Sequence, residues 1–146
     1  MAGVAATIEL EGLEDVERRL AGLSAWDREE ALFAVGELLA SAAKERIATE
    51  KAGPDGAAWV PWSEAYDETR EARHSLLVEE NSLLESVQVY ASGEGVAVGT
   101  NLVYAATHQF GRDEVNIPAR PYLGMSEVDR LDIRDLILGE IEEAGA

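Results

Sequence analysis

Residues 27–50, DREEALFAVGELLASAAKERIATE, contain the longest hydrophobic repeat of the chain. Its apolar residues recur at steps of three and four, which predicts a helix with one apolar face. These residues are Leu32, Val35, Leu39, Ala42, Ala43 and Ile47. Asp27 suits the N-cap of this helix. The turn sequence GPDG at 53–56 ends it. One long amphipathic helix is therefore predicted over 27–50.

Shorter patterns on either side of this helix predict a small antiparallel sheet. Residues 7–10 alternate between polar and apolar types, as in a strand. Residues 87–91 and 96–98 alternate in the same way around the turn sequence SGEG at 92–95. Alternation on both sides of a glycine-rich turn predicts a β-hairpin.

Three further helices are expected. A short one follows Gly12, with apolar residues Leu13, Val16 and Leu20. Ser63 caps a short polar helix, and residues 126–129, SEVD, resemble a capping box that starts a final helix. The apolar residues of that final helix are Val128, Leu131, Leu136, Ile137 and Ile141. The sequence thus predicts an α+β fold: a small antiparallel sheet packed on a long helix, with a C-terminal helix over another part of the core or an edge.

The composition excludes several classes of protein. The 146 residues include 29 acids, 12 bases and no cysteine, for a net charge of −17. Residues 1–73 hold 16 acids and 8 bases, and residues 74–146 hold 13 acids and 4 bases, so the acidity is evenly spread. Tight DNA binding needs clustered Lys and Arg, which this sequence lacks. No apolar run approaches the ~20 residues of a membrane span, and the N-terminus does not resemble a signal peptide. We expect a soluble protein made in the cytoplasm that binds no membrane.

Two neighbouring motifs carry a family resemblance. Residues 104–111 read YAATHQFG, and residues 117–126 read IPARPYLGMS. Upstream, residues 55–62 read DGAAWVPW, and Leu77, Asn81, Leu83 and Ser86 are spaced as a fourth element. Over residues 50–140 the chain resembles the phage virion morphogenesis family, also called tail-completion proteins, of Mu-like phages and prophages. That family typically shows YAxxHQFG, then IPARPFLG, then a closing helix.

The resemblance implies a single virion morphogenesis domain over residues 1–146 that acts at the head–tail junction. Related neck and tail-terminator proteins form rings, commonly hexameric, that cap the tail tube. The implied partners are therefore copies of the chain itself, the tail tube and the head–tail connector proteins. DNA would pass through the ring without specific binding, and the protein would reside at the neck or tail end of the virion.

The sequence departs from the family pattern at two positions. Asn81 stands where the family usually has glycine, and Trp62 stands where it often has leucine. Asn tolerates positive φ better than most non-glycine residues, so the same backbone turn is expected at Asn81. Trp62 is expected to fill a similar but larger apolar pocket, and the core is the expected place for both Trp59 and Trp62.

The proline-rich motif suggests an assembly contact. Pro118 and Pro121 fix their own φ and extend the residues before them, which produces a stiff segment. Such a segment could reach a neighbouring subunit at low entropic cost, or it could pack on its own domain. The predicted interface residues are Tyr104, His108, Gln109, Phe110, Ile117, Pro118, Arg120, Pro121, Tyr122 and Leu123. Arg120 is expected to find a carboxylate, slightly favouring one on the neighbour.

No enzymatic site is predicted. His108 and His74 are the only histidines, and no metal-binding, phosphate-binding or nucleophile motif accompanies them. His108 is expected to be a buried polar residue that fixes a turn through hydrogen bonds. We expect no catalytic residue, no cofactor and no metal.

Two alternatives to a virion ring come from other classes. An acidic DNA mimic that binds a DNA-binding protein would explain the charge alone. A small hydrolase would use scattered carboxylates together with His108. The ring hypothesis also gives the charge a role, because a negative lumen would let DNA slide without adhering.

Overall fold

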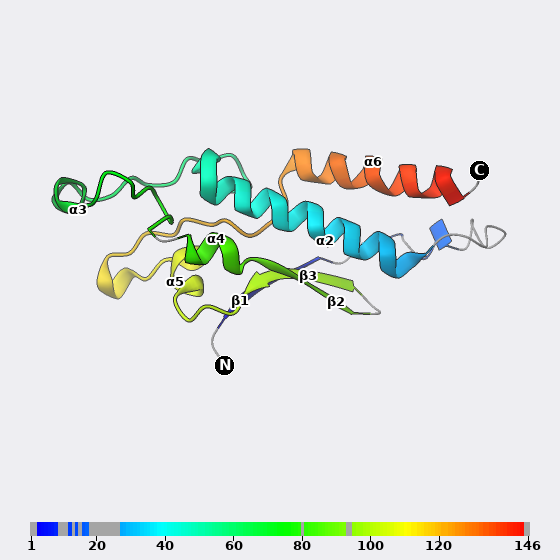
Figure 1. Cartoon of the computed structure of the whole chain (residues 1–146), viewed down its shortest axis with the longest axis horizontal. Coiled ribbons are helices and arrows are strands. Elements are labelled where there is room, and N and C mark those ends of the chain that lie inside the picture. The colour runs from blue at the N-terminus through cyan, green and yellow to red at the C-terminus, as the bar shows by residue number, and fades with distance from the viewer. Residues whose placement is uncertain are drawn as a thin grey trace.

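The computed structural model describes residues 3–8, 12, 14, 16–17, 27–79, 81–92 and 95–144. Figure 1 shows the elements in these ranges, and the predicted α+β class is confirmed. They are β1 (Val4–Ile8), α2 (Arg28–Glu45) with a π-helical turn (Arg46–Glu50), α3 (Glu64–Thr69), α4 (Ser82–Ser86), β2 (Gln88–Ser92), β3 (Gly95–Thr100), α5 (Ala105–Phe110), a 3-10 turn (Asp113–Val115) and α6 (Glu127–Ala144).

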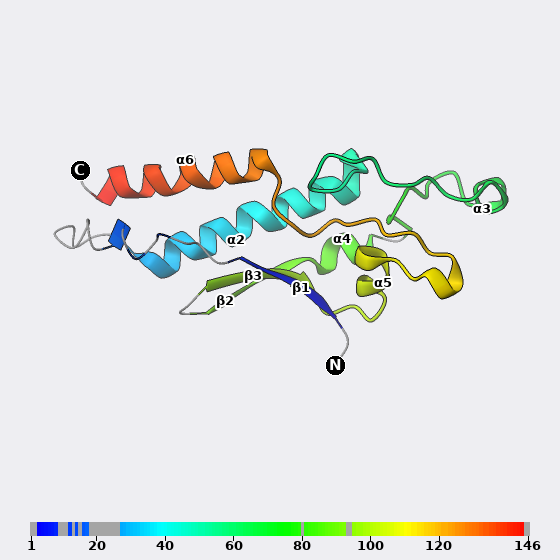
Figure 2. The same cartoon turned by 180° about the vertical axis from the view of Figure 1, so that it is seen from behind.

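The sheet has the order β1-β3-β2, and both pairings are antiparallel. Val4 pairs with Thr100, and Val89 pairs with Val98. One face of this sheet packs against α2, and α6 lies on the other side of α2 (Figures 1 and 2). The described part of the chain therefore has three layers, with α2 in the middle. None of its helices is both long and apolar enough to cross a membrane.

Local signals place most elements correctly. Asp27 caps α2 by accepting a hydrogen bond from the Glu30 amide at 3.2 Å, as predicted. Ser63 caps α3, whose residues are all exposed or partly exposed, and the 88–92 and 95–100 hairpin is confirmed. Asn81 has φ 61°, the left-handed conformation expected for it. The helix expected near 13–20 lies mostly outside the described residues, as do Glu9 and Leu10 of the first strand.

The apolar residues of α6 divide between two faces. Ile133 is 5% exposed and belongs to the core, whereas Val128 is 65% exposed and Leu131 is 36% exposed. Val128 and Leu131, two of the apolar residues expected on this helix, therefore lie on its exposed side. The helix is oriented by Asp129, which is buried one residue away from Val128.

A buried ion pair joins α2 to α6. Arg46, 3% exposed, pairs through Nη2 with the Asp129 carboxylate and donates through Nη1 to Tyr122 O at 3.1 Å and Gly124 O at 3.2 Å. Asp129 also accepts from the Ser126 amide at 2.9 Å, and Ser126 Oγ accepts from the Asp129 amide at 3.0 Å. The predicted capping box is confirmed, and one of its members also neutralises a buried arginine.

Residues 60–76 form an extended excursion, here called the arm, with α3 at its tip (Figure 1). A buried arginine and a half-buried lysine hold its two ends. Arg120 donates from Nε to Val60 O at 2.8 Å and from Nη2 to Pro61 O at 3.2 Å. Lys51 donates from Nζ to Ser75 Oγ at 2.9 Å and to Leu76 O at 2.8 Å. The base of the arm is thus fixed to the body.

The α2–sheet contact generates a stability prediction. A Cβ at Gly36 would lie 2.5 Å from Val89 Cγ1 and 2.5 Å from Val96 Cγ2, two stiff β-branched side chains. We expect Gly36→Ala to lower the free energy of unfolding by about 1–3 kcal/mol, as overpacking does. Gly139 in α6 has no neighbour within 4 Å of such a Cβ, so Gly139→Ala should stabilise by up to about 1 kcal/mol. Urea denaturation measures both, and equal effects would contradict this account of Gly36.

Candidate assembly site

The two motifs of the sequence form one hydrogen-bonded unit. Gln109 on α5 accepts through Oε1 from the amides of Tyr122 and Leu123, both at 3.0 Å. Its Nε2 donates to Leu123 O at 3.1 Å. The Arg120 amide donates to His108 O at 2.7 Å. The side chain of Gln109 therefore satisfies three backbone groups of the proline-rich segment and holds that segment along α5.

Tyr122 anchors this segment in the core. Its side chain is fully buried, and its hydroxyl donates to Ala105 O at 3.0 Å. Burial raises the pKa of Tyr122, and the nearby Tyr104 adds to the shift, so the phenol remains a hydrogen-bond donor. On the other side, Trp59 Nε1 donates to Pro121 O at 2.9 Å. The segment is thus enclosed between α5 and residues 59–61.

Gly111 is required where α5 ends. It has φ 75°, and a Cβ there would lie 2.7 Å from Ala119 N and 3.0 Å from Ile117 O. The Gly111 amide donates to Thr107 O at 2.8 Å, which closes the helix. Glycine therefore permits the proline-rich segment to pass close beside the end of α5.

The stiff segment packs on its own domain, which was one of the two placements left open by the sequence. Arg120 is 7% exposed, and Tyr122 and Leu123 are likewise buried within the chain. Ile117, Pro118 and Pro121 are half-buried. Within the chain Arg120 donates to the carbonyls of residues 60 and 61 and pairs with no carboxylate of the described residues, while its pairing with a carboxylate of a neighbouring copy stays a prediction. These side chains support the site from inside.

Other predicted residues face outward. Phe110 is 70% exposed and Tyr104 is 44% exposed, and neighbouring Val103 and Val115 are 76% and 51% exposed. We call these four residues the ridge; one of them, Tyr104, also lines the cavity described below. Large exposed apolar side chains gathered within one short segment are typical of interaction sites. Sequence reasoning missed Val103 and Val115, because a lone valine in a loop carries no periodic signal.

The side chain of His108 was expected to fix the turn through hydrogen bonds, and it does not. Its Nδ1 is buried without a hydrogen-bond partner in the described part of the chain, and Gln109 makes the fixing contacts instead. The His108 ring packs edge-on against Tyr104, with centroids 5.7 Å apart. Burial lowers the pKa of His108, and the charge of Arg120 lowers it further.

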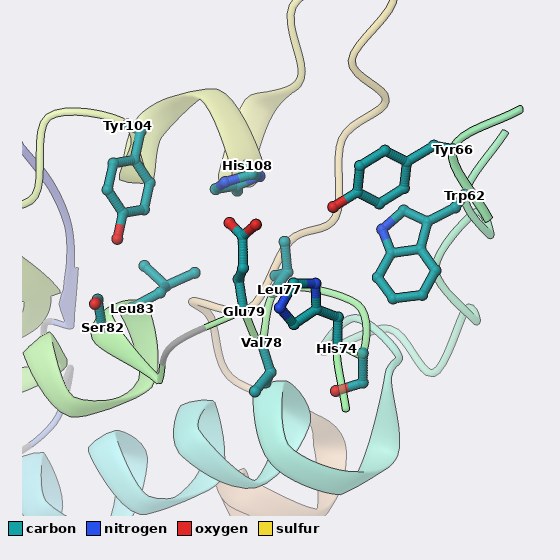
Figure 3. A pocket seen from close by; sticks show the side chains of 11 residues that line it. Trp62, Tyr66, His74, Leu77, Val78, Glu79, Ser82, Leu83, Tyr104 and His108 are labelled. Carbon is teal, nitrogen blue, oxygen red and sulfur yellow. The ribbon is translucent and has the colours of Figure 1, made fainter. Parts of the chain in front are cut away.

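A cavity of about 500 Å³ opens between α4, α5 and the base of the arm. His74 and His108 both line it, and Figure 3 shows the Glu79 carboxylate pointing toward the His108 ring. Across the described ranges, no three His, Cys, Asp or Glu side chains are placed to hold a metal ion. Trp62 lies at the cavity wall and not in the core, contrary to expectation, because the Arg70 guanidinium stacks 4.4 Å from its ring centroid.

Arg46 is a supporting residue that the sequence analysis missed. It follows Ala43 and precedes Ile47 on the apolar face of α2, where an arginine needs a buried partner. The position of Arg46 in the sequence therefore indicated a buried partner. Its partner Asp129 could not be identified, because the two residues are 83 positions apart.

The Gln109 contacts predict that supporting residues and surface residues of the site contribute differently to the free energy of unfolding. Gln109→Leu removes three hydrogen bonds and leaves backbone groups unsatisfied, so unfolding free energy should fall by about 3 kcal/mol. Phe110→Ala removes an exposed ring and should change it by no more than about 0.5 kcal/mol. Urea denaturation followed by tryptophan fluorescence tests both. A Phe110 variant as unstable as the Gln109 variant would contradict the division.

His108 predicts a pH dependence of stability. Its folded-state pKa lies below 6.5, so the unfolded chain binds more protons as the pH falls. The stabilising contribution of neutral His108 is therefore complete above about pH 6.5 and is lost as the pH drops through the folded-state pKa. His108→Gln should reduce the loss of unfolding free energy between about pH 7.5 and pH 5, measured by urea denaturation at each pH. Thr107→Ser is the control, and an unchanged pH profile in the His108 variant would disprove the assignment.

Comparisons with known proteins agree on one family. The model of the phage virion morphogenesis family matches residues 8–142. Over 111 residues the chain is 27% identical to "Putative capsid assembly protein G" of Escherichia phage Mu, covering 68% of this chain and 71% of that protein. It is 40% identical over 62 residues to "Mu-like prophage FluMu G protein 2" of Haemophilus influenzae, covering 39% and 45%.

A third relative is an uncharacterized protein of Methanocaldococcus jannaschii, 36% identical over 72 residues, with 44% of this chain and 53% of that protein covered. The chain thus spans about half the length of this protein and of the Haemophilus protein. No solved structure matches the chain. Because the family match leaves out only the two ends, this protein belongs to the phage virion morphogenesis family, with a role in the structure and assembly of phage particles.

Proposed function

We propose that this protein completes the head–tail junction of a tailed phage. It assembles with copies of itself into a ring at the neck or tail end of the virion, and DNA passes through that ring. Its other partners are the tail tube and the head–tail connector proteins. The family membership supports a structural role, and the described residues supply a surface suited to assembly.

The ridge is the observation that carries this proposal. Val103, Tyr104, Phe110 and Val115 present apolar side chains to solvent. Gln109 and Tyr122 hold the backbone beneath them, so little conformational entropy is lost when the ridge is covered. Exposed aromatic residues on a rigid support are common anchors of protein interfaces. Half-buried Ile117, Pro118 and Pro121 extend the same segment.

The ring itself is inferred from the family resemblance and from the geometry of assembly. Tail-terminator and neck rings are commonly hexameric, and we propose six copies here. A contact between two different surfaces of neighbouring copies closes into a ring when the rotation per copy divides a full turn. The arrangement requires that each copy carry two distinct contact surfaces.

The distribution of charge suits the passage of DNA. Arg46, Lys51 and Arg120 direct their cationic groups to carbonyls or to Asp129 within the fold, so these groups are engaged by the chain itself. A chain with net charge −17 that withdraws three of its 12 cations presents few phosphate-binding groups. A lumen formed by such subunits repels phosphate and lets DNA slide.

Electron microscopy and sedimentation velocity of the purified protein, with and without tail tubes, test the proposal. We expect rings that bind the end of the tube. Phe110→Ser should abolish ring formation while the monomer stays folded. Phe33→Ser changes the exposed phenylalanine of α2, far from the ridge in sequence. It is the matched control and should leave rings intact.

A purified protein that stays monomeric and does not bind tail tubes would contradict the proposed function. A monomer that instead bound a DNA-binding protein with steep salt dependence would favour the DNA-mimic alternative. Equal assembly by the wild type and the Phe110 variant would show that the ridge is not part of the interface.

A further inference from the structure

The cavity beside α5 combines aromatic rings with a carboxylate. Its volume is about 500 Å³, within the range of about 300–1,000 Å³ that is usual for ligand pockets. Trp62 and Tyr66 line it from the arm, and Tyr104 lines it from the start of α5. Of the described residues that line the cavity, only Glu79 carries a carboxylate, and none is a lysine or an arginine. The lining therefore has the character of a site for a cation.

The Glu79 carboxylate is available to a ligand. Its side chain is exposed, and no group of the described residues donates a hydrogen bond to it or forms an ion pair with it. Figure 3 shows the carboxylate pointing toward the His108 ring, with the Tyr66 hydroxyl directed toward the same space. An ionised carboxylate only accepts hydrogen bonds, and its two oxygens can accept both arms of a guanidinium at once.

Two buried imidazole nitrogens also lack partners at this cavity. The His74 side chain is 9% exposed, and the Nδ1 atoms of His74 and His108 are both buried without a hydrogen-bond partner among the described residues. Such atoms are rare in folded proteins. Because both rings line the cavity, a ligand that carries N–H groups can supply a partner after a small rotation of either ring. Burial lowers the pKa of His108, so this ring is neutral at neutral pH and does not repel a cation.

Two arginines lie near the cavity wall, but the chain already engages both. Arg70 stacks 4.4 Å from the Trp62 ring centroid and pairs with Asp67 at 2.5 Å. Arg120 donates to two carbonyls at the start of the arm. The stacking of Arg70 shows that this aromatic wall accepts a guanidinium, while the charge of Glu79 stays uncompensated by the described residues.

We infer that the cavity binds the cationic side chain of an arginine or lysine from another protein. The cationic group lies against Glu79, and the rings of Tyr66 and Tyr104 contact its charge and its aliphatic stem. A different protein is favoured over a second copy, because each arginine in the described ranges already pairs with a carboxylate or carbonyl of its own chain. A chain with net charge −17 also attracts basic partners. The identity of that partner rests on the proposed function, which supplies the tail tube and the connector proteins.

Nuclear magnetic resonance with small probes tests the cavity directly. The chain has two histidines, His74 and His108, so their imidazole resonances are readily assigned. N-acetyl-arginine amide should shift both sets of resonances in a saturable way. N-acetyl-citrulline amide, which has nearly the same shape without the charge, should give no saturable shift at matched ionic strength. Inorganic phosphate, the opposing anionic probe, should give none either.

A pair of variants tests the role of the carboxylate. Glu79→Gln removes one charge and should weaken binding of N-acetyl-arginine amide about tenfold, as expected for the loss of a charge-assisted hydrogen bond. The circular dichroism spectrum should be unchanged, because Glu79 is exposed. Glu37→Gln makes the same chemical change at an exposed position of α2 that does not line the cavity, and it should bind the probe as the wild type does.

The same variants identify the source of the cationic group. Glu79→Gln should form rings as the wild type does in the absence of other proteins, and it should bind tail tubes more weakly in co-sedimentation. Loss of ring formation in this variant would place the cationic group on a second copy and would overturn the assignment to another protein.

The remaining outcomes separate this inference from the proposed function. Equal shifts from the arginine and citrulline probes, saturable shifts from phosphate, or undiminished binding by Glu79→Gln would overturn the inference while the ring function stands. A wild-type chain that binds N-acetyl-arginine amide but neither assembles nor binds tail tubes would overturn the proposed function, and with it the partner's identity, but not the cation site.

Discussion

The buried pairing of Arg46 with Asp129 sets the positions of the elements on which the assembly site depends. A guanidinium removed from water requires a carboxylate and further acceptors, and here Asp129, Tyr122 O and Gly124 O supply them. Such a pair adds little net stability compared with apolar residues of similar volume, but losing one partner is costly. Its structural consequence is that the end of α2, the proline-rich segment and the start of α6 occupy one fixed arrangement.

That arrangement explains why residues of the two motifs have different roles. Gln109 and Tyr122 satisfy backbone groups from the inside, and Arg120 does the same for the base of the arm. Phe110, which follows Gln109 on the same helix, is exposed, and Tyr104 at the start of that helix is partly exposed and lines the cavity. The motif residues therefore shape a surface that their exposed neighbours complete. The residue types of the motifs are thus specified by the backbone groups that they satisfy.

The sequence predicts elements whose determinants are local. Asp27, Ser63 and Ser126 each accept a hydrogen bond from an amide three residues away, and the alternation of the hairpin is equally short-ranged. The left-handed conformation of Asn81 was expected from the glycine usual at this position in the family that the sequence resembles, together with the tolerance of asparagine for positive φ. Contacts across the fold could not be predicted in this way. Proline stiffness predicted an extended segment but left open whether it packs on its own domain, which Trp59 and Gln109 decide.

The orientation of α6 shows a second limit of periodicity. The helix has apolar residues on opposite sides, so spacing alone does not reveal which side faces the core. The polar residue Asp129 decides, because it must reach the buried Arg46 and so turns Ile133 inward and Val128 outward. The same ion pair that completes the core of one copy thereby exposes an apolar stripe on its surface. The buried charge therefore determines which apolar residues of α6 enter the core and which remain exposed.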